Sequence, residues 1–129
     1  MVAYLAPDDP AHDQVAARLD QFNGQIITTS AVITEVMHFV APARGGPRLV
    51  ADFAIAVGMD VFDFSEPELL LEAARLMEKY ADTPMDFADA TLLLLAEASR
   101  TLDILTLDRR GFSTYRTRQS KPLRLVLDA

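Results

Sequence analysis

The chain has 129 residues, which is the length of one domain, and with 50% hydrophobic and 24% charged residues it can bury a core, so a disordered chain is excluded. It contains no cysteine, which excludes a disulfide scaffold, a thiolate zinc site and a cysteine nucleophile. The net charge of −7 is unevenly spread: residues 100–129 hold seven basic and three acidic residues, and residues 1–99 hold five basic and 16 acidic ones. This pattern fits a metal site beside a phosphate-binding surface, and chance clustering on a solvated surface explains it equally well.

The N-terminal half predicts alternating helices and strands. The predicted elements are, in chain order, a helix from the Asp9-Pro10 cap to Asn23-Gly24, a strand over Gln25–Thr28, a helix from Thr29 or Ser30 to Pro42, a helix over Leu49–Val57 and a strand over Asp60–Phe64.

The C-terminal half continues the alternation. The predicted elements are a helix opened by a Ser65–Glu68 capping box and ended by Thr83-Pro84, a very apolar helix from Asp86 through Ala96, a strand over Leu102–Leu107 and a last strand over Leu123–Leu127. Strands that alternate with helices indicate an α/β sandwich of three layers, a mainly parallel sheet flanked by helices, in a single domain over residues 1–129. Such a sheet normally begins with a strand, whereas Met1–Leu5 is short and compatible with a helix.

We expect a soluble, cytoplasmic protein. Met1–Leu5 has no positive flank and Pro7 follows it closely, which is unlike a secretory leader. The longest apolar run, Ala90–Ala96, is too short to span a bilayer.

Four acidic residues follow the predicted strands. Glu35 lies in the second turn of its helix, Asp86 and Asp89 occupy a cap and first turn, and Asp108 directly follows a strand. Because ligands collect at the carboxyl ends of parallel strands, we expect Glu35, Asp89 and Asp108 to share one cleft. Converging carboxylates repel one another, and Mg²⁺ or Mn²⁺ relieves that repulsion.

Such a metal site suits hydrolysis of a phosphodiester by a metal-activated water, with the neighbouring Arg109 and Arg110 holding the substrate backbone. Each acid also has a structural explanation. Asp86 is favoured as a helix cap over a direct ligand, and Asp108 can simply begin a turn. Glu35 has apolar neighbours on both sides, which favours a functional role for it. His12 and His38 have no partner spacing that supports a zinc site.

Three segments carry a resemblance to a known family: residues 28–36 (TTSAVITEV), 84–90 (PMDFADA) and 105–112 (LTLDRRGF). In this order and at this spacing they resemble the PIN-domain family, and more narrowly the VapC-type toxins of bacterial toxin–antitoxin pairs. The likeness covers essentially the whole chain.

The resemblance implies a parallel sheet flanked by helices and a quartet of acids that binds Mg²⁺ or Mn²⁺ and cleaves RNA. Carried over to this chain, it places metal ligands at Glu35, Asp89 and Asp108, makes Asp86 a further candidate, and gives Thr106 the polar position that supports the last aspartate. It also implies an RNA substrate, a cognate antitoxin bound along a groove, and a homodimer.

The chain departs from the family pattern at its start. The family begins with a hydrophobic strand that ends in an aspartate, and Met1 falls where the turn after it belongs; Asp8 and Asp9 come too late for that role. We expect upstream codons to encode a run of Val, Ile or Leu ending in aspartate. The alternative is a catalytically inactive PIN-like module that binds a protein partner or RNA. A receiver-type phospho-acceptor domain is disfavoured because its acid pair is absent and Lys121 lies in an unsuitable loop.

Overall fold

The computed structural model describes residues 10–106 and 108–128, and of Arg109 and Asp128 it describes the backbone alone. The predictions that concern Met1–Leu5, Asp9, Leu107 and the side chain of Arg109 therefore lie outside the described residues. The predicted helix start at Pro10 is wrong, because Pro10 lies in a turn and the first described helix has its N-cap at Ala11.

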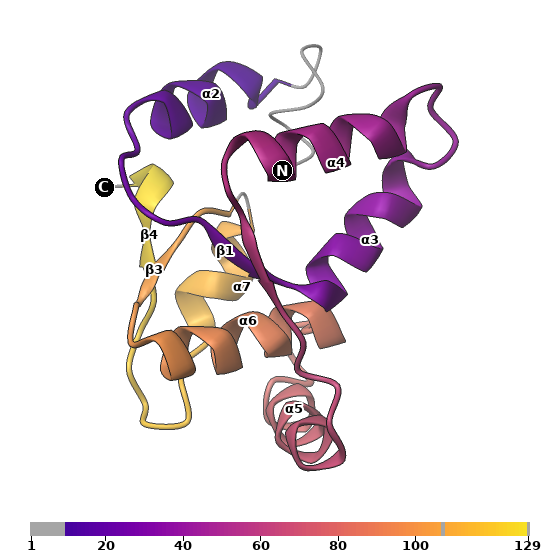
Figure 1. Ribbon diagram of the computed structural model, residues 1–129. Helices are drawn as coiled ribbons and strands as arrows, with labels where there is room; N and C mark the ends of the chain where they lie inside the picture. The colour runs from indigo at the N-terminus through magenta and orange to yellow at the C-terminus, as the bar shows by residue number, and fades with distance from the viewer. Residues whose placement is uncertain (1–9, 107, 129) are drawn as a thin grey trace.

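Helices and strands alternate along the chain, as the sequence predicts. The elements are, in order, α2 (His12–Asp20), β1 (Ile27–Thr29), α3 (Ser30–Val40), α4 (Gly46–Ala56), β2 (Asp60–Phe62), α5 (Pro67–Lys79), α6 (Phe87–Ser99), β3 (Asp103–Ile104), α7 (Arg109–Thr114), β4 (Arg124–Leu125) and the 3₁₀ turn η1 (Val126–Asp128) (Figure 1). The α/β class is confirmed. Helix α7 was not predicted, because its six residues are too few to show a helical period.

Local capping explains where two of the helices begin. Thr29 has an extended backbone, and its Oγ1 accepts the N–H of Val32 at 3.3 Å, which starts α3. Asp86 caps α6 in the same way. The predicted capping box of Ser65 and Glu68 is wrong: Glu66 is the N-cap of α5 without a side-chain cap bond, and the Ser65 hydroxyl instead donates to Asp63 Oδ1 at 2.5 Å.

The strands of the described chain form two parallel pairs. In one pair β1 lies beside β2, with Ile27 opposite Asp60, and in the other β3 lies beside β4, with Asp103 opposite Arg124. Figure 1 shows α2 and α4 on one side of the strands and α6 on the other, with α5 packed outside α6. The predicted layers and parallel pairing are therefore present, although the pairs are not joined to each other within the described residues.

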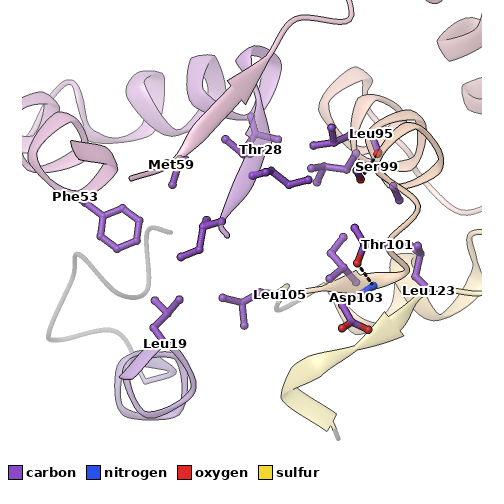
Figure 2. A pocket seen from close by; sticks show the side chains of 16 residues that line it. Leu19, Thr28, Phe53, Met59, Leu95, Ser99, Thr101, Asp103, Leu105 and Leu123 are labelled. Atoms are coloured by element: carbon purple, nitrogen blue, oxygen red, sulfur yellow. Dashed lines mark hydrogen bonds between the residues drawn. The ribbon is translucent and has the colours of Figure 1, made fainter. Parts of the chain in front are cut away.

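A cavity of about 200 Å³ separates the two strand pairs. Figure 2 shows apolar side chains entering it from several elements, among them Leu19 of α2, Phe53 of α4 and Leu95 of α6. The polar side chains of its lining lie mainly toward the β3 end, where the Asp103 N–H donates to Thr101 Oγ1 at 3.3 Å. The cavity walls are thus the inner surfaces of all three layers.

The main core lies around α6. Leu93 and Leu94 are almost completely buried, and they pack with Leu76 of α5, with Phe112 of α7 and with Tyr115, which follows α7. At about 25 cal/mol per Å² of buried apolar surface, these large side chains supply most of the driving force for placing α6 centrally. In the described part of the chain, no helix is long and apolar enough to cross a membrane.

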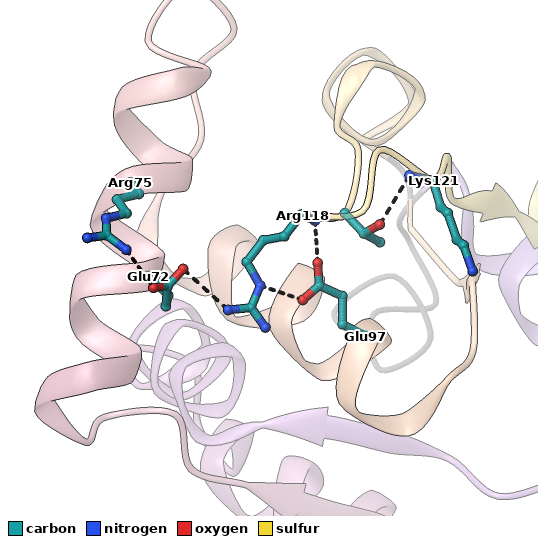
Figure 3. A network of polar contacts seen from close by, with 6 residues as sticks. Glu72, Arg75, Glu97, Arg118 and Lys121 are labelled. Atoms are coloured by element: carbon teal, nitrogen blue, oxygen red, sulfur yellow. Dashed lines mark hydrogen bonds and ion pairs between the residues drawn. The ribbon is translucent and has the colours of Figure 1, made fainter.

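An ion-pair network attaches the C-terminal segment to this core (Figure 3). The Arg118 guanidinium contacts Glu97 Oε2 of α6 at 2.6 Å and Glu72 Oε2 of α5 at 3.3 Å, and the Arg118 backbone N–H donates to Glu97 Oε1. The Lys121 N–H donates to Thr117 Oγ1 at 3.1 Å and closes the turn. Arg118 therefore bridges two helices and the segment that leads to β4.

Candidate functional site

A buried pair of threonines places the start of α3 against α6. Thr29 and Thr91 are 0% and 1% exposed, and their hydroxyl oxygens lie 2.8 Å apart. The Thr91 hydroxyl also donates to the Ala88 carbonyl at 2.7 Å, which leaves Thr29 as the donor of the shared bond. The first turn of α3, which leads to Glu35, is thereby held beside the first turn of α6.

Asp86 and Asp89 form a reciprocal capping box at the start of α6. The Asp89 N–H donates to Asp86 Oδ1 at 2.9 Å, and the Asp86 N–H donates to Asp89 Oδ2 at 3.2 Å. The structural role predicted for Asp86 is therefore confirmed. Each carboxylate uses one oxygen in the box, so its second oxygen remains for another interaction.

Asp108 lies in the turn between β3 and α7. Its Oδ1 accepts the N–H of Gly111 at 3.0 Å, so it is the N-cap of α7. Its own N–H donates to Thr106 Oγ1 at 3.0 Å, which places the predicted supporting residue in direct contact with Asp108. The turn thus presents the carboxylate at the end of β3.

The carboxyl group of Glu35 lies beside the α6 cap. A side-chain hydrogen bond with Asp86 is the largest cause that raises the pKa of Glu35 to about 7, followed by burial and by the negative charges of Asp86 and Asp89. Two carboxyl groups in hydrogen-bonding contact share a proton when no cation is present. Glu35 from α3 and Asp86 from α6 therefore belong to one electrostatic site.

Asp89 connects this pair with Asp108. Burial is the largest cause that raises the pKa of Asp89 to about 6; the Asp86 N–H opposes that shift, and the charges of Asp86 and Asp108 add to it. Asp89 is half-buried, whereas Glu35, Asp86 and Asp108 are exposed. The structure thus brings acids from three distant segments close enough to shift one another's pKa values.

The donor chemistry of this site fits a hard divalent cation. Carboxylate oxygens are the ligands that Mg²⁺ and Mn²⁺ prefer, and among the described side chains no lysine or arginine forms an ion pair with these four acids. Within the same residues, however, no three Asp, Glu or His side chains stand together closely enough to hold an ion. A cation would have to draw the carboxylates inward from these positions.

Of the two arginines predicted to hold the substrate backbone, the structure describes the side chain of Arg110 alone. It is exposed on the first turn of α7, two residues after Asp108. That position is on the same turn as the acid and open to solvent.

Sequence reasoning missed the residues that hold these turns in place. Thr91 was detectable, because it is the one polar residue in Ala90–Ala96. Tyr115 and Gly111 carried no signal, because their roles depend on a contact with Pro84 and on a close approach to Asp108.

Comparison with known proteins adds two findings. Residues 1–117 match the PIN domain family. The chain is also 31% identical over 118 residues to a protein named Ribonuclease VapC26 from Mycobacterium tuberculosis, an alignment that covers 90% of this chain and 87% of that protein. The match to the family includes Glu35, Asp86, Asp89 and Asp108.

Proposed function

Because the chain belongs to the PIN-domain family and is of the VapC type, we propose that it is a metal-dependent endoribonuclease. The observation that carries this proposal is that Glu35, Asp89 and Asp108 lie near one another although they are far apart in the sequence. The negative charge of Asp89 helps to raise the pKa of Glu35, and the negative charge of Asp108 helps to raise the pKa of Asp89. A metal-dependent hydrolase that cleaves phosphodiesters uses such an excess of negative charge to hold its cation. The substrate in this proposal is single-stranded or structured RNA.

The proposed ligands of the cation are Glu35, Asp89 and Asp108, with Asp86 as a further candidate. When bound, Mg²⁺ or Mn²⁺ supplies an acidified water and neutralises charge that develops on the phosphate. Thr106 holds the backbone of Asp108 in place. Arg110, and Arg109 beside it in the sequence, supply positive charge to the phosphate backbone of the RNA.

We also propose that the protein works in the cytoplasm as the toxin of a toxin–antitoxin pair, binds a cognate antitoxin protein, and forms a homodimer. Exposed apolar side chains on two adjacent helices support protein contacts: Phe39 of α3 is 68% exposed and Ile55 of α4 is 78% exposed. Large exposed apolar side chains are typical of interaction sites where they lie next to one another. Light scattering tests the dimer directly, because one chain has a mass of 14.2 kDa and a dimer has twice that mass.

The experiment that tests the nuclease compares Asp89→Asn with the parent chain. Asparagine keeps the size and much of the hydrogen bonding of Asp89 but removes the charge that holds the cation. We expect loss of Mn²⁺ binding in calorimetry and a loss of roughly a thousandfold or more in cleavage of a long single-stranded RNA. Circular dichroism checks that the variant remains folded.

Asp86→Asn is the matched control, because asparagine is also a good helix cap and Asp86 already has a structural duty. We expect it to lose only about 10- to 100-fold in rate. Equal activity of Asp89→Asn and the parent would contradict the nuclease proposal. A parent chain that binds RNA or a protein partner but shows no Mn²⁺-dependent cleavage would support the alternative of an inactive binding module.

A further inference from the structure

Tyr115 is a completely buried residue that connects the two ends of the candidate site. Its side chain is 0% exposed, and its Oη donates to the carbonyl of Pro84 at 2.5 Å. Pro84 lies two residues before Asp86, in the segment that leads into α6. The rings of Tyr80 and Phe112 contact Tyr115 edge to face, with centroids 5.1 and 5.2 Å away, so the phenol has little freedom to move.

The same phenol lies against the turn that carries Asp108. A Cβ atom placed on Gly111 would lie 2.5 Å from Asp108 Oδ2 and 3.0 Å from both Cε2 and Oη of Tyr115. Gly111 therefore occupies the narrow space between the carboxylate and the phenol, and it also donates its N–H to Asp108 Oδ1. No larger residue fits there without displacing one of the two groups.

The pKa of Tyr115 gives a second indication that the phenol lies near the acids of the site. Burial raises the pKa of Tyr115 to about 12, and the negative charges of Asp89, Asp108 and Asp86 contribute to the shift. The phenol thus remains a protonated donor at neutral pH, and three of the four acids lie within its electrostatic reach.

We propose that Tyr115 is a positioning residue of the candidate metal site. Its hydrogen bond to Pro84 and its packing over Gly111 set the separation between the Asp108 turn and the α6 cap that carries Asp86 and Asp89. The phenol touches neither substrate nor cation in this role. The inference rests on the proposed function, because it assigns Tyr115 to the same set of carboxylates.

The test uses Tyr115→Phe in the full chain, because this change removes Oη and keeps the ring that packs in the core. Tyr80→Phe is the matched control. Tyr80 lies in the same aromatic cluster, and its Oη accepts the Arg116 N–H at 2.8 Å and donates to the Arg116 carbonyl at 3.5 Å. Tyr80→Phe therefore also removes partly buried hydrogen bonds, but to Arg116 and not to Pro84. Thermal melting shows whether the two variants lose similar stability.

The decisive readout is the affinity for Mn²⁺ alone, measured by calorimetry. We expect Tyr115→Phe to weaken it about 10- to 100-fold, as is typical when a group that orients metal ligands is removed, and Tyr80→Phe to leave it within about twofold. In RNA cleavage at saturating Mn²⁺, kcat should fall for Tyr115→Phe and remain close to the parent value for Tyr80→Phe.

Gly111→Ala provides a second variant, which changes the spacing at the Asp108 turn and not at Tyr115 itself. Its methyl group pushes on Asp108 Oδ2, so Mn²⁺ affinity should fall although alanine is otherwise the better helix former. If the parent binds Mn²⁺ and Tyr115→Phe and Tyr80→Phe bind it with equal affinity, the positioning role of Tyr115 is overturned, and the proposed function is not affected. A parent without Mn²⁺ affinity would overturn the proposed function and this inference together.

Discussion

At the residue scale, Glu35 and Asp89 show how neighbouring carboxyl groups avoid repelling one another by keeping a proton. Both carboxyl groups have raised pKa values, Glu35 through its hydrogen bond with Asp86 and Asp89 through burial. A raised pKa means that the folded chain holds a proton more tightly than the unfolded chain does. Without a cation, proton sharing is the remaining way to keep these groups together.

The first prediction is that the chain without metal loses stability as the pH rises from about 4.5 to about 7. In that range Glu35 keeps its proton in the folded state and has released it in the unfolded state, so a rise in pH favours unfolding. This contribution is fully present below pH 4.5 and is lost as the pH passes about 7. Glu35→Gln should flatten the dependence, whereas Glu78→Gln on the exposed side of α5 should not. Urea unfolding at several pH values measures it, and an identical slope for all three proteins would contradict it.

The second prediction concerns competition between protons and the cation. Because a bound cation requires ionised carboxylates, Mn²⁺ binding should release protons and strengthen as the pH rises from about 6 to about 8, through the pKa values of Asp89 and Glu35. Calorimetry in two buffers of different ionisation enthalpy counts the protons. Binding that is independent of pH over this range would show that these two groups are not ligands.

At the scale of the elements, the contact between α3 and α6 depends on the buried hydroxyls of Thr29 and Thr91. Each of them has a second partner within its own helix, so the pair forms a short chain of hydrogen bonds from Val32 to Ala88. Such a chain fixes the position of one helix start relative to the other, because buried hydroxyl groups must be satisfied. Glu35 and the α6 cap face each other as a consequence.

The third prediction is a measurable coupling between these threonines. Thr91→Val leaves the Thr29 hydroxyl without its acceptor and should lower the free energy of unfolding by about 1–3 kcal/mol. The Thr29→Val, Thr91→Val double variant should lose about 1 kcal/mol less than the sum of the single variants, because an apolar pair then replaces the hydrogen-bonded hydroxyl pair at nearly the same shape and leaves neither hydroxyl without its partner. Chemical denaturation gives all three values, and strict additivity would show that the 2.8 Å contact contributes nothing.

At the scale of the whole molecule, Arg118 holds the last part of the chain on the helical core. It reaches Glu97 of α6 and Glu72 of α5, and Glu97 is only 7% exposed. The path from α7 to β4 passes this contact, so the position of β4 beside β3 depends partly on it. The long-range topology thus uses an ion pair whose Glu97 carboxylate is shielded from solvent, whereas the Arg118 side chain is half-exposed.

The fourth prediction compares two arginines that share the same partner. Arg118→Ala removes the bridge between three segments and leaves the shielded Glu97 without a cation, and because Arg118 itself is half-exposed we expect a loss of about 1–2 kcal/mol. Arg75→Ala breaks only an exposed pair within α5, also to Glu72, and should cost about 0.5 kcal/mol or less. Thermal unfolding separates the two cases. Equal effects would mean that Arg118 adds no more than an ordinary surface charge.

The sequence by itself determined the features whose causes lie within a few residues. The starts of α3 and α6 were predictable because Thr29 and Asp86 bond to N–H groups three positions later. The α/β alternation followed from short apolar runs, and family membership followed from three motifs in order. The prediction from local sequence was wrong at Ser65. Its hydroxyl donates to the carboxylate of Asp63 and does not cap the first turn of α5.

The tertiary structure decided which distant groups meet. The order of residues did not predict the hydrogen bond between Glu35 and Asp86. It also did not predict that Tyr115 donates to the carbonyl of Pro84, 31 residues earlier in the chain. The tertiary structure also decided that the described strands form two separate parallel pairs around a cavity. That the acids form a metal site stays a prediction. Contacts of this kind depend on how whole layers pack, because the entropy of closing long loops is offset only by the apolar surface that the packed core buries.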